Sequence, residues 1–330
     1  RRSSDLHMKN RALKQIFSSI WKMLKDFPVV LIMILFFIGF SVLFPDRFLS
    51  QLNFSSMMRQ FVTLMLFAIG PSMVMTMGSL DLTYVGIWML GGALVWFLFP
   101  VLGLASILVV PLLGVVTGFM VGVIQAKAKI PSFILTLSIM FTYWGLTALI
   151  SGGSPRSVQG FEFITAKLIP VIPTALLWTI PVLAASIYVT KYTRFGTYLY
   201  ALGSNEEGAH LAGINVLKYK ILAFTVSGLF IGIGSMILFQ HMGGSVAVEM
   251  NLNTMNWPLV AIILGGTPLM GGSGGPQRTI LGALTLTLLV RGLNVAMLKP
   301  EAIQLLVGLM LIASILVGSR SANKGGLEVS

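Results

Sequence analysis

Long apolar segments that are nearly free of charge constrain this chain more than any other feature. We delimit ten of them, at residues 28–44, 61–77, 82–97, 101–124, 130–150, 171–190, 217–239, 257–270, 279–298 and 302–318. A helix needs about 20 apolar residues to cross the hydrocarbon core of a bilayer. Charged residues make up 10% of the 330 residues, against about 25% in a soluble domain. The sequence therefore predicts an all-α integral membrane protein with about ten transmembrane helices, and it excludes an ordinary soluble enzyme.

The distribution of basic residues predicts the orientation of these helices. An even number of spans places both termini on one side of the membrane. Sixteen of the 22 lysine and arginine residues then lie on the side of the termini, five lie on the other side, and Arg291 falls within a span. Basic residues accumulate on the cytoplasmic side of membrane proteins, so both termini are expected in the cytoplasm. Five spans followed by five would give two inverted halves, a common plan in transporters.

The two ends of the chain differ from its membrane body. Residues 1–26 form a basic N-terminal tail, and Arg1 to His7, which precede the first methionine, are expected to have no function. From Lys9 to Asp26 the apolar residues recur at helical spacing, which predicts an amphipathic helix in the headgroup plane. A flexible basic leader is the alternative. The transmembrane domain is expected at 27–320 and a cytoplasmic tail at 321–330.

Several kinds of chemistry are excluded by composition. The chain has no cysteine, so it holds no disulfide and no thiolate metal site. Its net charge of +12 is not accompanied by clusters of basic and aromatic residues, so we expect no nucleic-acid partner. The three histidines lie far apart, and no paired carboxylates or nucleophile sets accompany them. We therefore expect no catalytic residues and no metal bound by this chain.

The most polar stretch of the membrane body is residues 191–220, a predicted cytoplasmic loop. Ser204 and Glu207 have the spacing of a capping box, and the adjacent Glu206 also suits the positive end of a helix dipole. Gly213 can adopt the left-handed conformation that ends a helix. The pattern predicts a short capped helix with compact side chains, suited to a groove on another protein. A solvated connector is the alternative at this stage.

Two short glycine-rich segments, 78–81 and 265–276, interrupt the apolar sequence. Such interruptions let helices break or backbones approach closely around a transport path, although a tight turn between antiparallel spans explains them equally well. Asp81 lies in the first segment, where it can cap the following helix. Capping is the preferred interpretation, and a place on the substrate path is the second.

Arg291 is the clearest charged residue inside a predicted span, where a charge is costly and usually faces a cavity or a partner. It can contact a polar or anionic substrate, pair with Asp81, Glu249 or Glu301, or extend its side chain to the outer surface. Aromatic and amide side chains suit the two faces of a sugar, and Trp257 can also anchor a span at the interface. The candidate substrate-path residues are Asp81, Trp257, Arg291, Asn294 and Gln304, with Asn256 as a further hydrogen-bonding candidate.

Five segments in order carry a resemblance that covers roughly residues 45 to 318. They are YALGSNEEGAHLAGIN at 200–215, GSLDLT at 78–83, the stretch 126–155 that begins AKAKIPSFILTL, LVAIILGGTPLMGGSGG at 259–275, and GLN at 292–294 with Gln304. Together they resemble ABC importer permeases of the ribose, galactose, xylose and autoinducer-2 type, which are related to branched-chain amino-acid permeases. The resemblance implies a bacterial cytoplasmic (inner) membrane protein.

The resemblance also implies partners. Such a permease pairs with a second permease, identical or homologous, docks on a cytoplasmic ATPase subunit and receives substrate from an extracellular or periplasmic binding protein. The sequence contains no G-x-x-x-x-G-K-[ST] motif, so ATP and Mg are expected on the ATPase. The family's coupling helix matches Asn205, Glu206, Glu207, Gly208, Ala209, His210, Leu211, Ala212, Gly213 and Ile214. Within it, Glu206 and Glu207 would form ion pairs, and Ala209 and Leu211 would fit the ATPase groove.

The function that follows is import of a monosaccharide or a related sugar by alternating access. Nucleosides and branched-chain amino acids are alternative substrates within the same superfamily. A secondary transporter in which Asp81 or Glu249 carries protons is a third hypothesis, and it predicts uptake without any ATPase. An integral membrane enzyme is disfavoured because no catalytic constellation is present.

Overall fold

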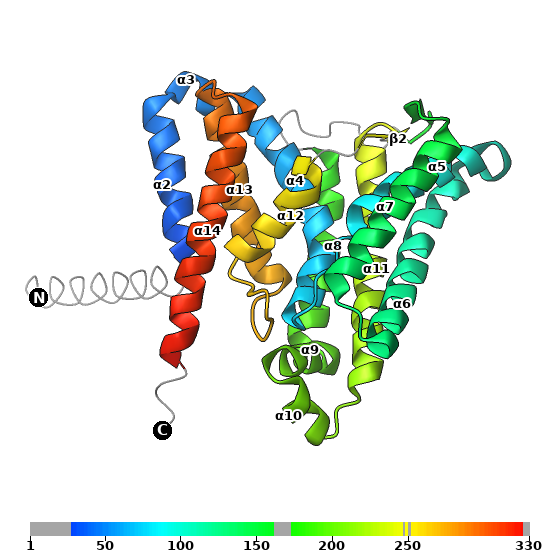
Figure 1. Cartoon of the computed structure of the whole chain (residues 1–330). Helices are drawn as coiled ribbons and strands as arrows, with labels where there is room; N and C mark the ends of the chain where they lie inside the picture. The colour runs from blue at the N-terminus through cyan, green and yellow to red at the C-terminus, as the bar shows by residue number, and fades with distance from the viewer. Residues whose placement is uncertain (1–27, 162–172, 247, 250–251, 326–330) are drawn as a thin grey trace, which may run out of the picture.

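The computed structural model describes residues 28–161, 173–246, 248–249 and 252–325. In these ranges the chain is almost wholly α-helical, and its long helices stand side by side (Figure 1). Helices prevail because a backbone in apolar surroundings satisfies its own N–H and C=O groups within each helix. The all-α prediction is confirmed. The amphipathic helix predicted near the N-terminus lies outside the described residues.

Each of the ten predicted apolar segments overlaps with one long helix. These are α2 (Pro28–Leu43), α4 (Gln51–Thr76), α5 (Thr83–Leu102), α6 (Val109–Ala128), α7 (Ser132–Ser151), α8 (Thr174–Tyr192), α11 (Val216–His241), α12 (Leu252–Leu264), α13 (Pro276–Val295) and α14 (Pro300–Gly325). Helix α14 therefore continues into the segment predicted as a C-terminal tail.

Six helical stretches in the described part of the chain are long and apolar enough to cross a membrane. One of them is the 46-residue stretch Thr83–Ala128, which contains both α5 and α6. The apolar parts of α2, α12 and α14 are shorter, at Val29–Leu43, Met255–Leu264 and Pro300–Leu316. These lengths fit a multi-pass membrane protein, whereas ten crossings and two inverted halves stay predictions.

A short 3-10 helix, η1 (Gly103–Leu108), joins α5 to α6. Gly103 has a φ of 55° and takes the turn at the end of α5, a conformation that glycine adopts without a steric penalty. The two helices pack against each other after the turn. The stretch Thr83–Ala128 is therefore a pair of helices rather than one continuous helix.

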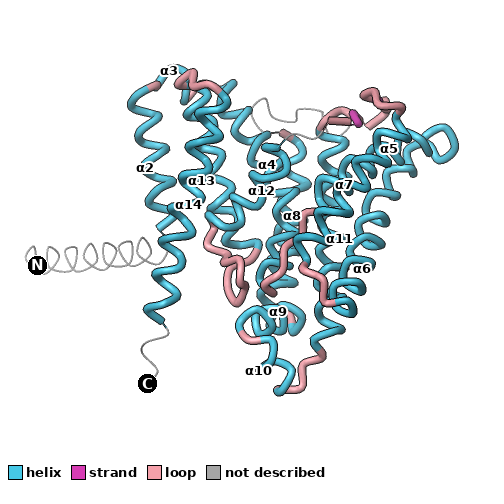
Figure 2. Tube along the Cα trace, in the orientation of Figure 1, coloured by secondary structure: helices cyan, strands magenta, loops and turns pink. Residues whose placement is uncertain are grey.

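Short elements gather at the two ends of the bundle (Figure 2). One end carries α3 (Pro45–Phe48) and a two-stranded antiparallel ribbon, in which Arg156 of β1 (Arg156–Ser157) is the partner of Val246 of β2 (Ser245–Val246). The opposite end carries α9 (Arg194–Ser204) and α10 (Glu206–Leu211). Helix α2 begins and α14 ends toward the end of the bundle that carries α9 and α10 (Figure 1).

Helices α4 and α11 form the centre of the packing. Helix α4 contacts α8, α11, α12 and α13, while α11 contacts α4, α5, α6 and α8. Val62, Leu66 and Ile69 of α4 are fully buried. The polar chemistry described below attaches to these two helices, so their position determines where it lies.

Glycines make the contact between α6 and α11 possible. A Cβ on Gly114 would lie 2.1 Å from the carbonyl oxygen of Gly228, and a Cβ on Gly118 would lie 2.1 Å from that of Phe224. Small residues spaced four apart let membrane helices approach until their backbones touch. Gly114 and Gly118 have this spacing on α6, as Gly228 and Gly232 have on α11.

The α6–α11 contact predicts the effect of adding one methyl group. Gly118→Ala should lower the thermal unfolding temperature of the purified protein, with a loss of about 1–3 kcal/mol, because the helices must move apart. Gly145→Ala on α7 is the matched control, since its Cβ meets nothing within 4 Å and alanine is favoured over glycine in a helix. An unfolding temperature equal in the two variants would contradict the close approach.

Candidate coupling surface and substrate path

Helix α10 is held at its start by Asn205. The backbone of Asn205 is extended, and its Oδ1 accepts a hydrogen bond from the Gly208 amide at 2.9 Å. The capping box predicted at Ser204 and Glu207 is wrong. Helix α9 continues through Ser204, whose Oγ donates to the Tyr200 carbonyl at 2.9 Å, so Ser204 lacks the non-helical backbone that an N-cap requires.

The end of α10 matches its prediction. Gly213 has a φ of 85°, and its amide donates to the His210 carbonyl while the Ile214 amide donates to that of Ala209. These two bonds satisfy carbonyls that the last turn of the helix leaves free. The following Asn215 caps α11 by accepting from the Lys218 amide at 2.9 Å.

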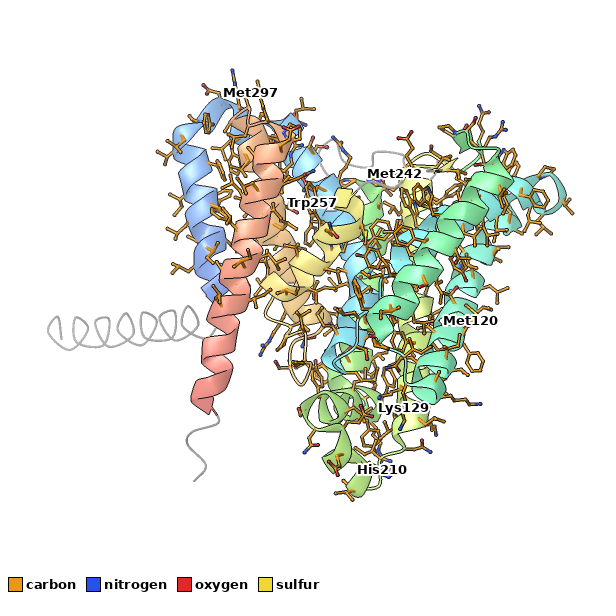
Figure 3. All side chains as sticks on the ribbon, in the orientation of Figure 1. Met120, Lys129, His210, Met242, Trp257 and Met297 are labelled. Atoms are coloured by element: carbon orange, nitrogen blue, oxygen red, sulfur yellow. The ribbon has the colours of Figure 1, made fainter. Side chains whose placement is uncertain are left out.

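Most of the ten predicted coupling residues lie on the surface. Leu211, near the end of α10, is 80% exposed. Glu206 forms an ion pair with Lys220, with 2.7 Å between Oε1 and Nζ. The exposed residues are Asn205, Glu206, Glu207, His210, Leu211, Ala212 and Gly213, the half-buried ones are Gly208 and Ile214, and the buried one is Ala209. Figure 3 shows His210 at the far end of the molecule.

Ala209 does not face outward. It is 6% exposed and packs in a cluster with Leu199 and Leu202 of α9 and with Ala223 and Phe224 of α11. The predicted contact of this residue with an ATPase therefore does not match its position. The Ala209 side chain packs α10 against the bundle, whereas the Leu211 side chain is exposed on the surface.

The glycine-rich segment 265–275 lies against α9. The Tyr200 hydroxyl donates to the Gly274 carbonyl at 2.8 Å, and Gln277 Nε2 donates to the same carbonyl at 2.7 Å. The Gly272 amide donates to the Thr76 carbonyl at the end of α4 at 2.9 Å. The segment thus connects α9 to α4, which neither its composition nor its spacing indicated.

Gly203 of α9 completes this junction. A Cβ on it would lie 2.0 Å from the Thr76 oxygen and 2.5 Å from the Gly272 nitrogen. Three segments that are distant in sequence therefore meet without intervening side chains. Sequence reasoning missed Thr76, Tyr200 and Gly203, because only the glycines of 265–275 had marked that segment as irregular.

Asp81 is buried between α5 and α11. Its Oδ1 accepts from the Thr83 amide at 3.0 Å and from the Thr83 hydroxyl at 2.6 Å, and its Oδ2 accepts from Ser227 Oγ at 2.9 Å. The side chain therefore accepts from the first backbone amide of α5, although the N-cap residue itself is Leu82 and Asp81 lies one residue before it. Ser227 was not identified from the sequence.

Arg291 bonds to a residue that the sequence did not suggest. Its Nε and Nη2 donate to Asn53 Oδ1 at 3.2 and 3.0 Å, and Asn53 Nδ2 donates to the Phe48 carbonyl at 2.8 Å. The predicted pairing of Arg291 with Asp81, Glu249 or Glu301 is not observed among the described ion pairs. Asn53 of α4 is 4% exposed. Through these bonds its side-chain amide connects α4 to α3 and to α13.

The other substrate-path candidates do not join these clusters. Asn294 is exposed and donates from Nδ2 to the Val290 carbonyl of its own helix at 2.8 Å. Trp257 is half-buried and packs against the core that α4, α12 and α13 share, in the half of the bundle opposite α10 (Figure 3). Gln304 is exposed on α14. Asp81 and Arg291 belong to separate hydrogen-bond clusters.

No group of three histidine, aspartate or glutamate side chains comes together in the described part of the chain. The arrangement instead provides a displayed helix at one end and hydrogen bonds that connect it to the centre.

Comparison with known proteins identifies the family. A family model described as the permease component of the branched-chain amino acid transport system matches residues 53–315. The chain therefore belongs to this family of membrane transport permeases, and the resemblance found in its motifs is confirmed. No solved structure matches the chain significantly.

Individual relatives carry more specific names. The ribose import permease protein RbsC of Haemophilus influenzae is 33% identical over 268 residues, which cover 77% of this chain and 80% of the relative. RbsC of Escherichia coli is 27% identical over 315 residues, which cover 93% and 97%. The xylose/arabinose import permease protein XylH of Sulfolobus acidocaldarius is 28% identical over 273 residues, which cover 76% and 72%.

The bonds of Asp81 predict different effects for two substitutions. Asp81→Leu should destabilise the protein by about 1–3 kcal/mol, because the buried donors of Thr83 and Ser227 lose their acceptor. Asp81→Asn should retain most of the stability, since its amide oxygen can still accept from Thr83. Thermal unfolding of both variants measures this, and equal losses would count against the capping role.

The junction at Tyr200 makes a separate prediction. Tyr200→Phe removes the donor to Gly274 and should accelerate amide hydrogen exchange in residues 265–275, at a cost of about 1 kcal/mol. Tyr198→Phe on the same helix is the control, because the Tyr198 ring packs against Tyr219 at a centroid distance of 4.7 Å. Unchanged exchange in Tyr200→Phe would show that the segment is held by other contacts.

Proposed function

We propose that this chain is the membrane subunit of an ATP-driven importer for a monosaccharide or a closely related sugar. The observation that carries the proposal is the match to the ribose import permease RbsC of Escherichia coli over 93% of the chain. A match of this extent includes α9, α10 and the glycine-rich segment as well as the long helices. The subunit is a non-catalytic permease, located in the bacterial cytoplasmic membrane with both termini in the cytoplasm.

In this proposal α10 is the coupling helix. The sequence contains no P-loop motif, so a cytoplasmic ATPase subunit binds ATP and Mg and hydrolyses the nucleotide. The exposed Leu211, Glu207 and His210 support docking on that subunit, because they form the outer surface of a helix that is otherwise anchored by Ala209.

The remaining partners follow the plan of an importer. A binding protein delivers the sugar at the end that carries α3 and the β1–β2 ribbon. A second permease, identical or homologous, and the lipid bilayer cover the exposed apolar side chains of the outer helices, which include Leu35 at 59% and Leu305 at 64% exposure. Burial of such surfaces away from water is favourable in either environment.

The contacts support a route for alternating access. Movement of α10 is passed to α9 and α11 through the cluster around Ala209, and to α4 through Tyr200, Gly203 and the segment 265–275. Rigid-body motion of packed helices can then expose the substrate path to one side of the membrane and then to the other. Asp81, Trp257, Arg291, Asn294 and Gln304 stay candidates for contact with the sugar.

Uptake into proteoliposomes tests the function. The purified chain is reconstituted with its ATPase and binding protein, and uptake of ribose, xylose, fructose, leucine and a nucleoside is compared. We expect uptake of a sugar that requires ATP and persists when a protonophore is added. Uptake at full rate without the ATPase would contradict the proposal and favour a secondary transporter, and uptake of leucine or of the nucleoside alone would move the substrate to the alternative classes.

A single substitution tests the coupling role. Glu207→Arg should reduce transport-stimulated ATP hydrolysis at least tenfold, because it reverses a charge on the docking face of α10. Glu301→Arg is the control, since Glu301 is an exposed acid in the first turn of α14, away from α10. Normal stimulation in Glu207→Arg, with wild-type membrane insertion, would count against docking through this helix.

A further inference from the structure

A groove of about 810 Å³ opens beside α10. One wall is formed by Gln125 and Ala126 at the end of α6 and by the turn Lys129–Pro131 that leads to α7, and the other wall is formed by residues between Glu206 and Lys220. Lys129 and His210 lie toward the same end of the molecule (Figure 3). The groove is therefore continuous with the exposed face of the coupling helix, and the α6–α7 turn extends that face.

The backbone of Lys129 is strained. Its φ is 54° and its ψ is 28°, in the left-handed region, where it ends α6 by donating its amide to the Gln125 carbonyl at 3.1 Å. Glycine is the usual residue at such a position, and a residue with a Cβ costs about 1–2 kcal/mol there. Lys129 therefore keeps a charged side chain at a position where glycine would relieve backbone strain.

The charges along the groove indicate what it accepts. Lys220 is paired with Glu206 at 2.7 Å, whereas no carboxylate lies within 4.0 Å of Lys129 among the described residues. Lys129 therefore places a positive charge on the rim of the groove, and an acidic side chain of an incoming polypeptide can pair with that charge.

We propose that this groove is a second contact for the ATPase subunit, in which an acidic segment of that subunit pairs with Lys129. The inference rests on the proposed docking of α10. It adds that the ATPase subunit contacts the α6–α7 turn as well as α10. Because α6 and α11 touch through Gly118 and Phe224, a partner bound to the α6–α7 turn and to α10 would move both helices together.

A pair of glycine substitutions tests the inference. Lys129→Gly removes both the strain and the charge, so the thermal unfolding temperature should not fall, while the affinity for the ATPase should fall about fivefold, as expected for one charge pair. Met297→Gly is the matched control. Met297 has a φ of 60° just after α13, at the opposite end of the bundle, so its replacement should leave ATPase affinity unchanged.

Charge reversal and lipid composition sharpen the result. Lys129→Glu should weaken ATPase binding more than tenfold, and high salt should reduce the difference from wild type. The measurements use nanodiscs of phosphatidylcholine alone. If Lys129→Glu and Lys129→Gly bind the ATPase as wild type does, the inference is wrong, and an effect of these variants only after phosphatidylglycerol is added would assign the groove to anionic lipid instead.

Cross-linking separates this inference from the proposed function. Because the chain has no cysteine, Lys129→Cys and Leu211→Cys each introduce one thiol, and Lys299→Cys on the opposite side is the control. Cross-linking of Lys129→Cys and Leu211→Cys to the ATPase supports both contacts. Cross-linking of Leu211→Cys alone overturns the groove contact and leaves the coupling role intact, while failure of both overturns the docking of α10 itself.

Discussion

The close approach of α6 and α11 is the constraint on which much of this architecture depends. Without a strong hydrophobic force between helices in lipid, packing relies on backbones that come near enough for dispersion contacts. Gly114 and Gly118 of α6 allow this against Gly228 and Phe224 of α11. Helix α11 in turn contacts α4, and its Ser227 donates a hydrogen bond to Asp81, so the position of the central polar group depends on that glycine contact.

Helices α9 and α10 connect the exposed end of the molecule to the centre of the bundle. Helix α10 is anchored through Ala209 to a cluster that includes residues of α6, α7, α9 and α11, and α9 reaches α4 through Tyr200 and the glycine-rich segment 265–275. A force applied at α10 therefore has two routes inward. One passes through side-chain packing and the other through backbone hydrogen bonds, which makes the displayed helix part of the bundle rather than an appendage.

Local sequence patterns predicted those features that depend on only a few neighbouring residues. The ten apolar segments each overlap with a helix, and Gly213 ends α10 as expected, because helical periodicity and left-handed glycine depend on a few neighbouring residues. The start of α10 was predicted one residue early. Its cap is Asn205, since the helix before it extends through Ser204, and where one helix ends and the next begins is decided by the packing of α9 on the bundle.

By itself, the sequence determined that the chain is a helical membrane protein, that its polar loop carries a short helix, and that its motifs belong to a permease family. Composition, periodicity and residue order carry those conclusions. Only the tertiary structure decided that Arg291 bonds Asn53, that Ala209 faces inward, and that Lys129 borders a groove beside α10. These partners are separated by many residues along the chain, and long-range packing, which no local pattern records, brings them together.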